Sequence, residues 1–523
     1  MKKFLCLAVA LLTAAGAFAG EIAKGYVYED VNGNGRKDGR DRGIAGVLVS
    51  DGQQIVQTDA KGRWQMEVDD HCVIFVIKPR GYISPLNEFL QPKSWYIHKP
   101  AGSPELKFAG SAPTGKLPKS LDFALVKFDD PENFKFFVFG DPQPYSMKEM
   151  QYFHDGIVAE ASQFKGPVFG ISLGDIVGER MDLYGAYLEA IKDMGVPWYN
   201  VIGNHDRNYD CVTEEYANES FEASFGPSTV AFQYGRVHFI MLDDIFMNNA
   251  PKANPYIGGF SEEQFRFLEA YEKYIPKDDL IIFGYHIPFN FKPGQFDSQM
   301  RERFFKIFEG HKIFGLSAHS HIQQQLYCGP EEGWHGEKPY HEYNVGTSNG
   351  DWYSGRLGPD GTPTSTMRDG TEKGYAVVTI TGTDYIFDYK VTNHPWEYQM
   401  SVYGTPVVPY NHGSKYPVYA NFFIGAPDAV VEFRIDGGKW AKMKHVTDEF
   451  DPYFLMEKVI WDQATEAMDG RRPDSLPFLC NHLWKGVVDN KLEPGIHHVD
   501  IRAKDIFGRT HKAVWNYRIE EVK

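Results

Sequence analysis

The chain has 523 residues, of which 42% are hydrophobic and 15% aromatic, and this length and composition predict two to four domains with sizeable cores. Its formal net charge is −16 at pH 7. An acidic balance of this size argues against nucleic acid or an acidic membrane surface as the main partner.

Residues 1–19 have the pattern of a secretory signal. Lys2 and Lys3 form a charged start, residues 4–14 form an apolar run, and Ala17 and Ala19 frame a small-x-small cleavage site. The run is too short to span a membrane. Cys6 comes too early to be a lipid-anchor cysteine. We therefore expect a soluble protein that is exported to the periplasm, the cell surface or the medium.

Export permits disulfides, and four cysteines follow the signal. Of these, Cys211 and Cys328 fall within one proposed domain, so they are the pair to test. Isolated buried thiols are the alternative.

Residues 20–125 are expected to form a small β-sandwich. Residues 26–28 and 47–49 have strand-like patterns, and residues 58–64 resemble a hairpin turn. The run 30–41 places oxygen-bearing side chains at positions 1, 3, 5, 9 and 12 with glycine at position 6, which is the register of a calcium loop. The candidate calcium ligands are Asp30, Asn32, Asn34, Arg36, Asp38 and Asp41.

The sequence before this loop is strand-like, so the helices of an EF-hand are missing. The run resembles instead the calcium-loop β-sandwich repeats of bacterial surface proteins. The alternative interpretation is a polar turn rich in Asn and Gly.

Residues 133–392 alternate apolar runs with helix-like stretches, which predicts layered α/β packing. Helices are expected at residues 147–164, 181–193, 261–274 and 298–309, with a capping box at residues 261–264. Five apolar runs end in polar residues: residues 134–140, 167–173, 196–202, 280–285 and 312–318. The side chains that follow them are Asp141, Gln143, Asp175, Asn204, His205, Asp206, His286, His319 and His321.

Open α/β folds place ligands at strand ends, so these side chains are candidates for one site. Residues two apart in an extended segment point the same way, which would let His319 and His321, or Asp141 and Gln143, bind one ion. Any single residue has a simpler alternative, a buried polar side chain satisfied by the backbone.

The ordered set resembles the calcineurin-like metallophosphoesterase superfamily, whose pattern is Asp-x-His, Gly-Asp, Gly-Asn-His-Asp/Glu, a lone His and Gly-His-x-His. Two positions depart from it, because Gln143 stands where most members have His and Ala318 replaces a Gly. A glutamine oxygen would favour Mn, Fe or Mg over Zn, weakly. Purple acid phosphatases carry Tyr three residues after the bridging Asp, where this chain has Gly178, so no purple colour is expected.

The resemblance implies a layered β-sandwich core flanked by helices and two divalent ions about 3.5–4 Å apart. It assigns Asp141, Gln143, Asp175 and His321 to the first ion. Asp175 would bridge to the second ion, which Asn204, His286 and His319 complete. A hydroxide activated by both ions would attack phosphorus, and His205, oriented by Asp206, would protonate the leaving oxygen.

Residues 344–374 form a long polar, glycine-rich stretch that we expect to shape the substrate pocket. Within it, Arg368 and Trp352 are candidate substrate contacts, and Arg368 could bind a phosphate oxygen through two hydrogen bonds. The alternative is a surface arginine that does not touch substrate.

Residues 393–523 contain period-two segments at 420–424, 429–435, 497–503 and 513–519, which predict a second β-sandwich. His482 lies in its middle, and we expect it to have a structural role rather than to reach the active site.

The leading hypothesis is thus an exported two-metal phosphoesterase with two β-sandwich attachments. Its substrate is a small-molecule or polymer phosphoester, either a monoester or a diester. The rival is a surface binding protein with an inactive phosphoesterase-like core, of which Gln143 would be the first sign.

Overall fold

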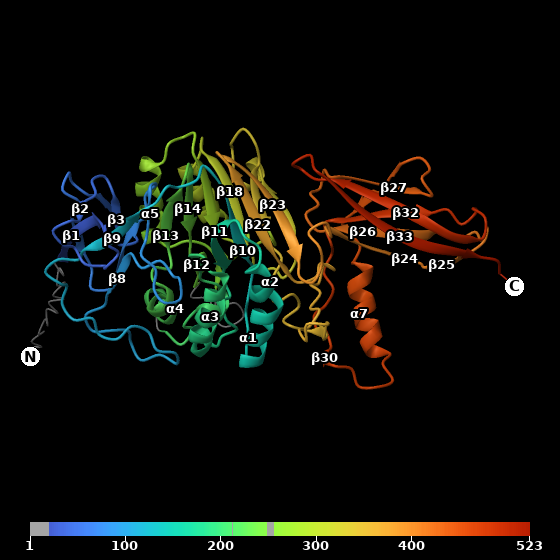
Figure 1. Cartoon of the computed structure of the whole chain (residues 1–523), viewed down its shortest axis with the longest axis horizontal. Coiled ribbons are helices and arrows are strands. Elements are labelled where there is room, and N and C mark those ends of the chain that lie inside the picture. The colour runs from blue at the N-terminus through green and yellow to red at the C-terminus, as the bar shows by residue number, and fades with distance from the viewer. Residues whose placement is uncertain (1–19, 212, 248–255, 523) are drawn as a thin grey trace, which may run out of the picture.

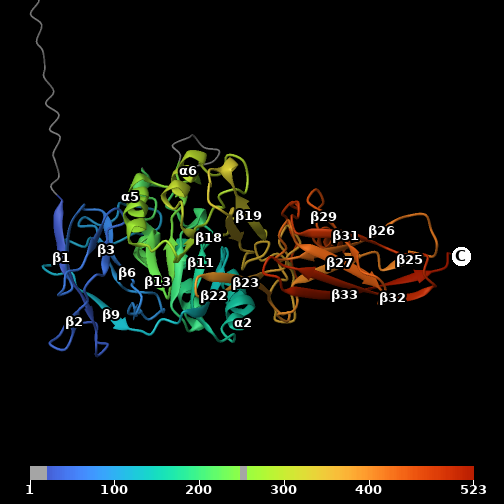
Figure 2. The same ribbon diagram turned by 90° about the horizontal axis from the view of Figure 1, so that it is seen from above.

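The computed structural model describes residues 20–211, 213–247 and 256–522, so the predicted signal at residues 1–19 lies outside the described residues. Figures 1 and 2 show three modules in a row along the longest axis, with the N-terminal module at one end and the C-terminal module at the other. No described helix is long and apolar enough to cross a bilayer. The four cysteines of the described chain are unpaired, so Cys211 and Cys328 form no disulfide.

Two β-sheets face each other in the central module. The first has the order β12 (Trp198–Val201), β11 (Pro167–Leu173), β10 (Asn133–Phe139), β22 (Gly374–Thr381) and β23 (Asp384–Val391). The second has the order β13 (Val230–Tyr234), β14 (Val237–Met241), β17 (Leu280–Gly284), β18 (Lys312–Ser317), β20 (Tyr340–Asn344) and β19 (Gln324–Cys328). Strands β10, β11 and β12 are parallel, as are β14, β17, β18 and β20.

Aromatic side chains fill the space between these sheets. Phe136 of β10 stacks on Phe169 of β11 with ring centroids 5.0 Å apart and meets Phe239 of β14 edge-on at 5.3 Å. All three are buried. Such pairs gain about 0.5–1.5 kcal/mol beyond the area they bury. The shared core therefore fixes the position of the two sheets relative to each other, and with it the position of the loops at their ends.

Helices cover the outer faces. α1 (Met147–Phe153), a π-helical segment at His154–Val158, α2 (Ala159–Ala161) and α3 (Tyr184–Ile191) pack on the first sheet. α5 (Glu262–Tyr271) and α6 (Ser298–Ile307) pack on the second. The expected capping box is confirmed, because Ser261 Oγ accepts from the Gln264 backbone N–H while Gln264 Oε1 accepts from the Ser261 N–H. The predicted sandwich core flanked by helices is confirmed.

The N-terminal module has two small sheets. One joins β2 (Arg42–Gly43), β1 (Glu21–Glu29), β9 (Phe123–Lys127), β7 (Tyr82–Ile83) and β5 (Arg63–Val68). The other joins β4 (Ile55–Gln57), β3 (Leu48–Ser50), β6 (Cys72–Ile77) and β8 (Trp95–His98). The expected hairpin at residues 58–64 is wrong, because β4 pairs with β3 while β5 pairs with β1, so this turn links two sheets.

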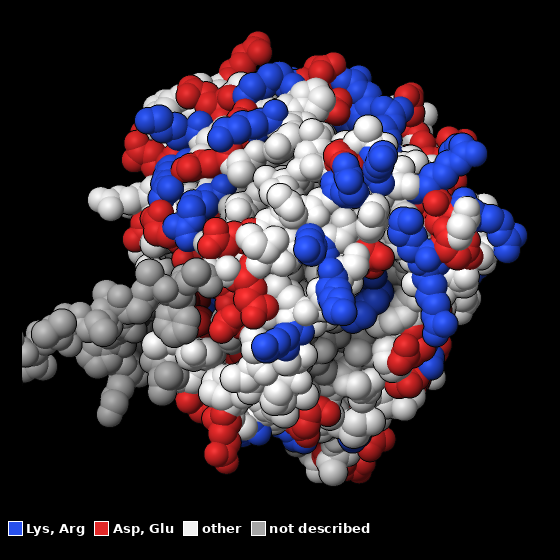
Figure 3. All heavy atoms as spheres, turned by 90° about the vertical axis from the view of Figure 1, so that its left-hand side faces the viewer, with Lys and Arg blue, Asp and Glu red and all other residues white. Residues whose placement is uncertain are grey.

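Buried charges fix this module to α4 (Glu219–Phe225), a helix that the sequence did not predict. Lys99 Nζ lies 2.7 Å from Glu219 Oε1 and 2.8 Å from Glu222 Oε2, and His71 Nε2 lies 2.6 Å from Glu219. On the outer end of the module, acidic and basic side chains are interspersed (Figure 3).

The C-terminal module is also two-layered. One sheet joins β24 (Met400–Gly404), β26 (Tyr416–Phe422), β31 (Leu483–Val488) and β29 (Lys444–Val446). The other joins β25 (Val407–Pro409), β33 (Thr510–Glu520), β32 (Gly495–Lys504), β27 (Val430–Ile435) and β28 (Ala441–Lys442).

The chain between β29 and β31 leaves this sandwich. It forms α7 (Pro452–Asp462), which lies on the same side of the molecule as α1 in Figure 1. It then forms β30 (Gly470–Arg471), which pairs with β21 (Gly355–Arg356) of the central module.

Candidate metal centre

The predicted ligands lie in loops that follow five strands of the central module. β10 precedes Asp141 and Gln143, β11 precedes Asp175, β12 precedes Asn204, β17 precedes His286, and β18 precedes His319 and His321. Gly203 lets two of these loops touch, because a Cβ there would lie 2.0 Å from the Asp175 nitrogen. The carboxyl ends of parallel strands share an edge, which brings these side chains close together.

Left-handed backbone marks five of these seven residues: φ is 36° at Asp141, 41° at Gln143, 47° at Asp175, 68° at His319 and 51° at His321. Such angles are uncommon outside glycine and gather at functional sites. We expected the pairs to face one way through strand alternation. That reason is wrong, because β10 and β18 end before these residues, so turns rather than strands aim the side chains.

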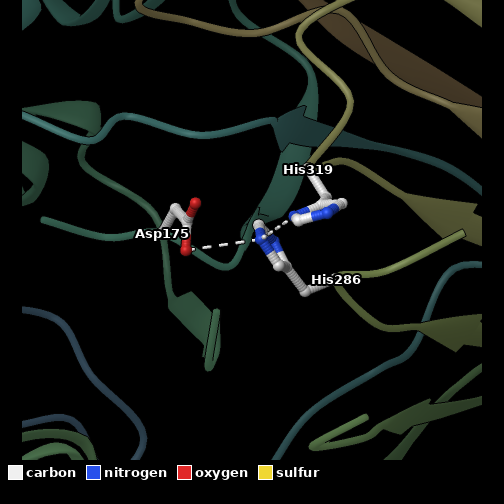
Figure 4. Close-up of side chains that lie close together, drawn as sticks. All are labelled: Asp175, His286 and His319. Carbon is white, nitrogen blue, oxygen red and sulfur yellow. Dashed lines mark hydrogen bonds and ion pairs between the residues drawn. The ribbon is translucent and has the colours of Figure 1, made fainter. Parts of the chain in front are cut away.

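Four of the predicted ligands direct donor atoms to one point. His286 Nε2 lies 3.3 Å from Asp175 Oδ1, 3.1 Å from Asn204 Oδ1 and 3.2 Å from His319 Nδ1. Figure 4 shows Asp175, His286 and His319 turned toward one another. Within the described ranges, these three form the one group of three or more His, Cys, Asp or Glu residues whose ligand atoms all lie within 4.8 Å of each other.

Hydrogen bonds on the far side of the His286 and His321 rings decide which nitrogen of each ring faces the other predicted ligands. The Nδ1–H of His286 donates to the Leu173 carbonyl at 2.8 Å, and the Nδ1–H of His321 donates to the Gly350 carbonyl at 3.2 Å. In a neutral ring this leaves Nε2 with a lone pair directed inward. Metal-binding histidines are usually oriented in this way.

Asp141 and His321 form a second donor group beside the first. His321 Nε2 is 3.8 Å from Asp141 Oδ1, and Asp141 Oδ2 accepts from the His319 backbone N–H at 3.0 Å. Gln143 borders this group through its backbone N–H, which donates to the Asp175 carbonyl at 2.9 Å. Its side-chain Oε1 accepts from Asn349 Nδ2 at 3.2 Å, so its oxygen is shared with a protein partner.

The electrostatics of the centre favour a cation. Burial raises the pKa of Asp141 far above its usual range, and Asp175 adds to the effect. Burial opposes a charge on His286, but Asp175 and Asp141 outweigh it and raise the pKa of that ring. Oδ1 of Asp141 is buried without a hydrogen-bond partner. Converging carboxylates, imidazoles and an amide oxygen in this state fit divalent ions, which would satisfy them.

Three family models match the chain in order. They are the N terminal of Calcineurin-like phosphoesterase at residues 31–112, Calcineurin-like phosphoesterase at residues 134–323, and the C terminal of Calcineurin-like phosphoesterase at residues 342–511. The chain belongs to the calcineurin-like phosphoesterases. It is therefore a hydrolase of phosphoric esters that depends on divalent metal ions, as the resemblance of its motifs implied.

Solved structures include a purple acid phosphatase from yellow lupin (Lupinus luteus) seeds, with 12% identity and a TM-score of 0.36 over 71% of this chain and 67% of that one. A likeness this weak bears on neither fold nor function. Comparison with curated proteins gives no match.

In this phosphoesterase, Tyr145 occupies the space beside Gly178. A Cβ at Gly178 would lie 2.5 Å from the Tyr145 ring, and the Tyr145 hydroxyl lies 3.3 Å from Gln143 Nε2. A larger residue at position 178 would therefore displace a ring at the edge of the centre.

His205 stands at the edge of the centre with a quarter of its side chain exposed. Its Nε2 is 4.0 Å from Asp175 Oδ2, and its Nδ1 is 3.3 Å from Glu179 Oε1. The expected orientation by Asp206 is wrong, because the Asp206 carboxylate accepts backbone N–H groups of Ile176, Val177 and Gly203 instead. Asp206 stabilises the loop that carries Asp175, and Glu179 is the carboxylate that faces the His205 ring.

Trp352 lies against His321, and Arg368 bonds the residue before it. The Trp352 ring stacks on the imidazole with centroids 3.9 Å apart, and Arg368 Nη2 donates to the Ser320 carbonyl. The Arg368 guanidinium also lies 5.4 Å from the Phe478 ring. Its Nε is buried and makes no hydrogen bond. Both candidates are thus beside the predicted ligands.

The sequence did not single out three residues that support the donors. Gln295 approaches His319 Nε2 with its carboxamide at 2.6 Å. Asp244 accepts from the His286 backbone N–H at 3.0 Å, and Asn349 holds Gln143. Gln295 and Asp244 follow no motif, whereas Asn349 lies in the long loop that was expected to shape the site.

The side chains of the N-terminal Asp/Asn loop, residues 30–41, form hydrogen bonds within the loop itself. Asp30 accepts from the backbone N–H groups of Gly33, Asn34 and Gly35, and Asp41 accepts from those of Val31 and Asp38. Asn32 and Asn34 donate to Asp38, and the Arg36 N–H donates to Asn34. The three carboxylates do not form a group with ligand atoms within 4.8 Å in the described chain. The calcium site stays a prediction.

Proposed function

We propose that this phosphoesterase is exported and hydrolyses a phosphoric mono- or diester with two divalent ions. One observation carries the proposal: side chains from loops after five strands converge as two adjacent donor groups, which meet where the His319 backbone N–H donates to Asp141. The signal pattern at residues 1–19 supports export. The acidic net charge supports a substrate other than nucleic acid.

Asp141, Gln143, Asp175 and His321 would hold one ion, and Asp175, Asn204, His286 and His319 the other. When bound, such a pair lowers the pKa of a water molecule and neutralises charge on the phosphoryl oxygens. The oxygen and imidazole donors suit Mn, Fe, Zn or Mg. Because the Gln143 oxygen already accepts from Asn349, this residue is the weakest donor of the set.

The proton for the leaving oxygen is assigned to His205. Its ring lies at the edge of the centre and is a quarter exposed, whereas His286 and His321 are buried. Glu179 faces Nδ1 at 3.3 Å and would stabilise the imidazolium form of the ring, in which Nε2–H faces the donor groups while Nδ1–H faces Glu179. A proton delivered from Nε2 would reach an oxygen that leaves from that side.

The test is a phosphate-release assay on chelator-treated protein that receives Mn, Fe, Zn or Mg in turn. Both p-nitrophenyl phosphate and bis-p-nitrophenyl phosphate are supplied. We expect at least one metal to restore hydrolysis in the wild-type protein and none to restore it in Asn204→Ala, which controls for contaminating activity. Absence of hydrolysis with every metal and both esters would favour the rival, a binding protein with an inactive core.

A further inference from the structure

A cavity of about 350 Å³ lies beside the metal centre, and two modules build it. Tyr145 precedes α1, Glu149 lies in the first turn of α1, and Asp351 and Trp352 come from the long loop of the central module. Arg471, Asp474 and Ser475 come from the segment after α7 in the C-terminal module. The volume is at the small end of ligand pockets, which suits a single ring.

Two aromatic rings connect this cavity to the centre. Trp352 stacks on His321, and Tyr145 lies edge-on to His205 with centroids 6.1 Å apart. A phosphoryl group at the donor atoms would therefore have its organic group directed along these rings. The cavity is the place for the alcohol part of the ester.

The C-terminal segment that forms one wall of the cavity is attached at several points to the long loop of the central module, residues 344–374. Strand β30 pairs with β21, the Phe478 N–H donates to the Arg368 carbonyl at 3.0 Å, and His482 Nε2 lies 3.0 Å from Asp369 Oδ2. His482 and Asp369 are fully buried. The wall is thus held in place before any substrate arrives, as a preformed pocket requires.

The polar side chains of the cavity match hydroxyl groups. Glu149 and Asp474 offer carboxylate acceptors, and Arg471 offers a donor that lies 3.9 Å from Glu149 and bonds the Trp352 carbonyl. Asp351 is buried and accepts from Ser354 Oγ at 2.9 Å. The three carboxylates outnumber the two guanidiniums beside them, Arg471 and Arg472, so the cavity disfavours a second phosphate. Aromatic side chains can stack on the C–H face of a saturated ring or on a flat base, so they do not distinguish the two. The carboxylate acceptors do, because a polyhydroxylated ring offers more hydroxyl donors to them.

We infer that the segment of residues 470–478 completes a subsite for the neutral, hydroxyl-rich ring of a sugar or cyclitol monophosphate. This assignment rests on the proposed hydrolase function. It makes the C-terminal module part of the substrate pocket, with Arg471 as a specificity residue.

The experiment compares Arg471→Ala with Arg434→Ala, a control in the same module whose guanidinium pairs with Asp500 at 2.8 Å and does not line the cavity. Substrates are glucose 1-phosphate, glucose 6-phosphate, myo-inositol 1-phosphate, AMP, glycerol phosphate and p-nitrophenyl phosphate, all with the activating metal. We expect a ring polyol phosphate to be the best alkyl substrate. Arg471→Ala should lower its kcat/KM about tenfold, mainly through KM, while p-nitrophenyl phosphate hydrolysis changes less than twofold. Arg434→Ala should change neither.

Equal losses on all esters in Arg471→Ala would overturn the inference, because Arg471 would then only support Trp352. Preference for AMP, or no preference for ring polyols over glycerol phosphate, would also overturn it. Failure of the wild-type protein to hydrolyse both p-nitrophenyl phosphate and bis-p-nitrophenyl phosphate with any metal is a different result, since it removes the proposed function itself.

Discussion

Two regions of this phosphoesterase gather oxygen-bearing side chains, and they do so in opposite ways. The Asp/Asn loop takes its acidic residues from one short run, and backbone N–H groups satisfy Asp30 and Asp41. The metal centre takes its donors from loops after five strands, and it leaves Asp141 Oδ1 buried without a partner. A sequence motif shows which polar side chains lie close together. A buried polar atom without a hydrogen-bond partner shows where a ligand would be bound.

The comparison is tested most strongly by removing one carboxylate charge from each region. Asp175→Asn should lower metal-activated hydrolysis on the order of 10³-fold, because metal stabilisation of phosphoryl charge is worth several kcal/mol. Asp38→Asn should leave hydrolysis within twofold. The readout is phosphate release at saturating metal, with thermal melting to show that both variants fold. Similar activity in the two variants would remove the distinction.

A second test concerns the ring at the edge of the centre. His205→Ala should lower kcat by about 10²-fold or more for an alkyl phosphate, whose leaving oxygen needs a proton. It should have a much smaller effect on p-nitrophenyl phosphate, whose leaving group departs as an anion. Glu179→Gln should follow the same pattern more weakly, since Glu179 faces Nδ1. A uniform loss over both leaving groups would contradict the role of His205 as proton donor.

Charges that are satisfied by protein partners should contribute stability rather than ligand affinity. Burial opposes ionisation of Glu219, but His71 and Lys99 lower its pKa from 4.5 to about 2. A depressed carboxyl pKa gives stability that is complete above pH 4.5 and is lost as pH falls toward 2, by about 3 kcal/mol in all. Melting temperatures from pH 6 to pH 3 should therefore fall less in Glu219→Gln than in the exposed control Glu215→Gln. Parallel curves would show that the network contributes no such stability.

The smallest effect is expected from calcium. If the Asp/Asn loop is satisfied by its own backbone, calcium should leave the melting temperature of the wild-type protein unchanged. Asp30→Ala should destabilise the N-terminal module by about 2 kcal/mol, because bonds to a charged acceptor are lost. A clear rise in melting temperature with calcium, absent in Asp30→Ala, would show that the loop binds the ion and that backbone bonds do not exclude a site.

Much of the architecture could be predicted from sequence, because apolar runs mark the strands and the polar residues that follow these runs mark the site. The resemblance of the motifs to a known family grouped Asp175, Asn204, His286 and His319, and the structure brings them together. Three features could not be predicted from the sequence. Left-handed turns at Asp141 and His321 have no glycine to mark them.

The partner of His205 was misassigned for a related reason. Asp206 is its neighbour in sequence, but its carboxylate turns toward the Asp175 loop, whereas Glu179 is distant in sequence and near in space. The role of residues 470–478 depends on β30 crossing to the central module, and a two-residue strand has no readable period.

The central claim is that separate loops form one binuclear centre around Asp175. Anomalous diffraction from crystals of the full chain grown with Mn²⁺ tests it most directly. The account predicts two peaks, one among Asp175, Asn204, His286 and His319 and one beside Asp141 and His321. Peaks elsewhere, or none in a protein that hydrolyses phosphoesters, would contradict it.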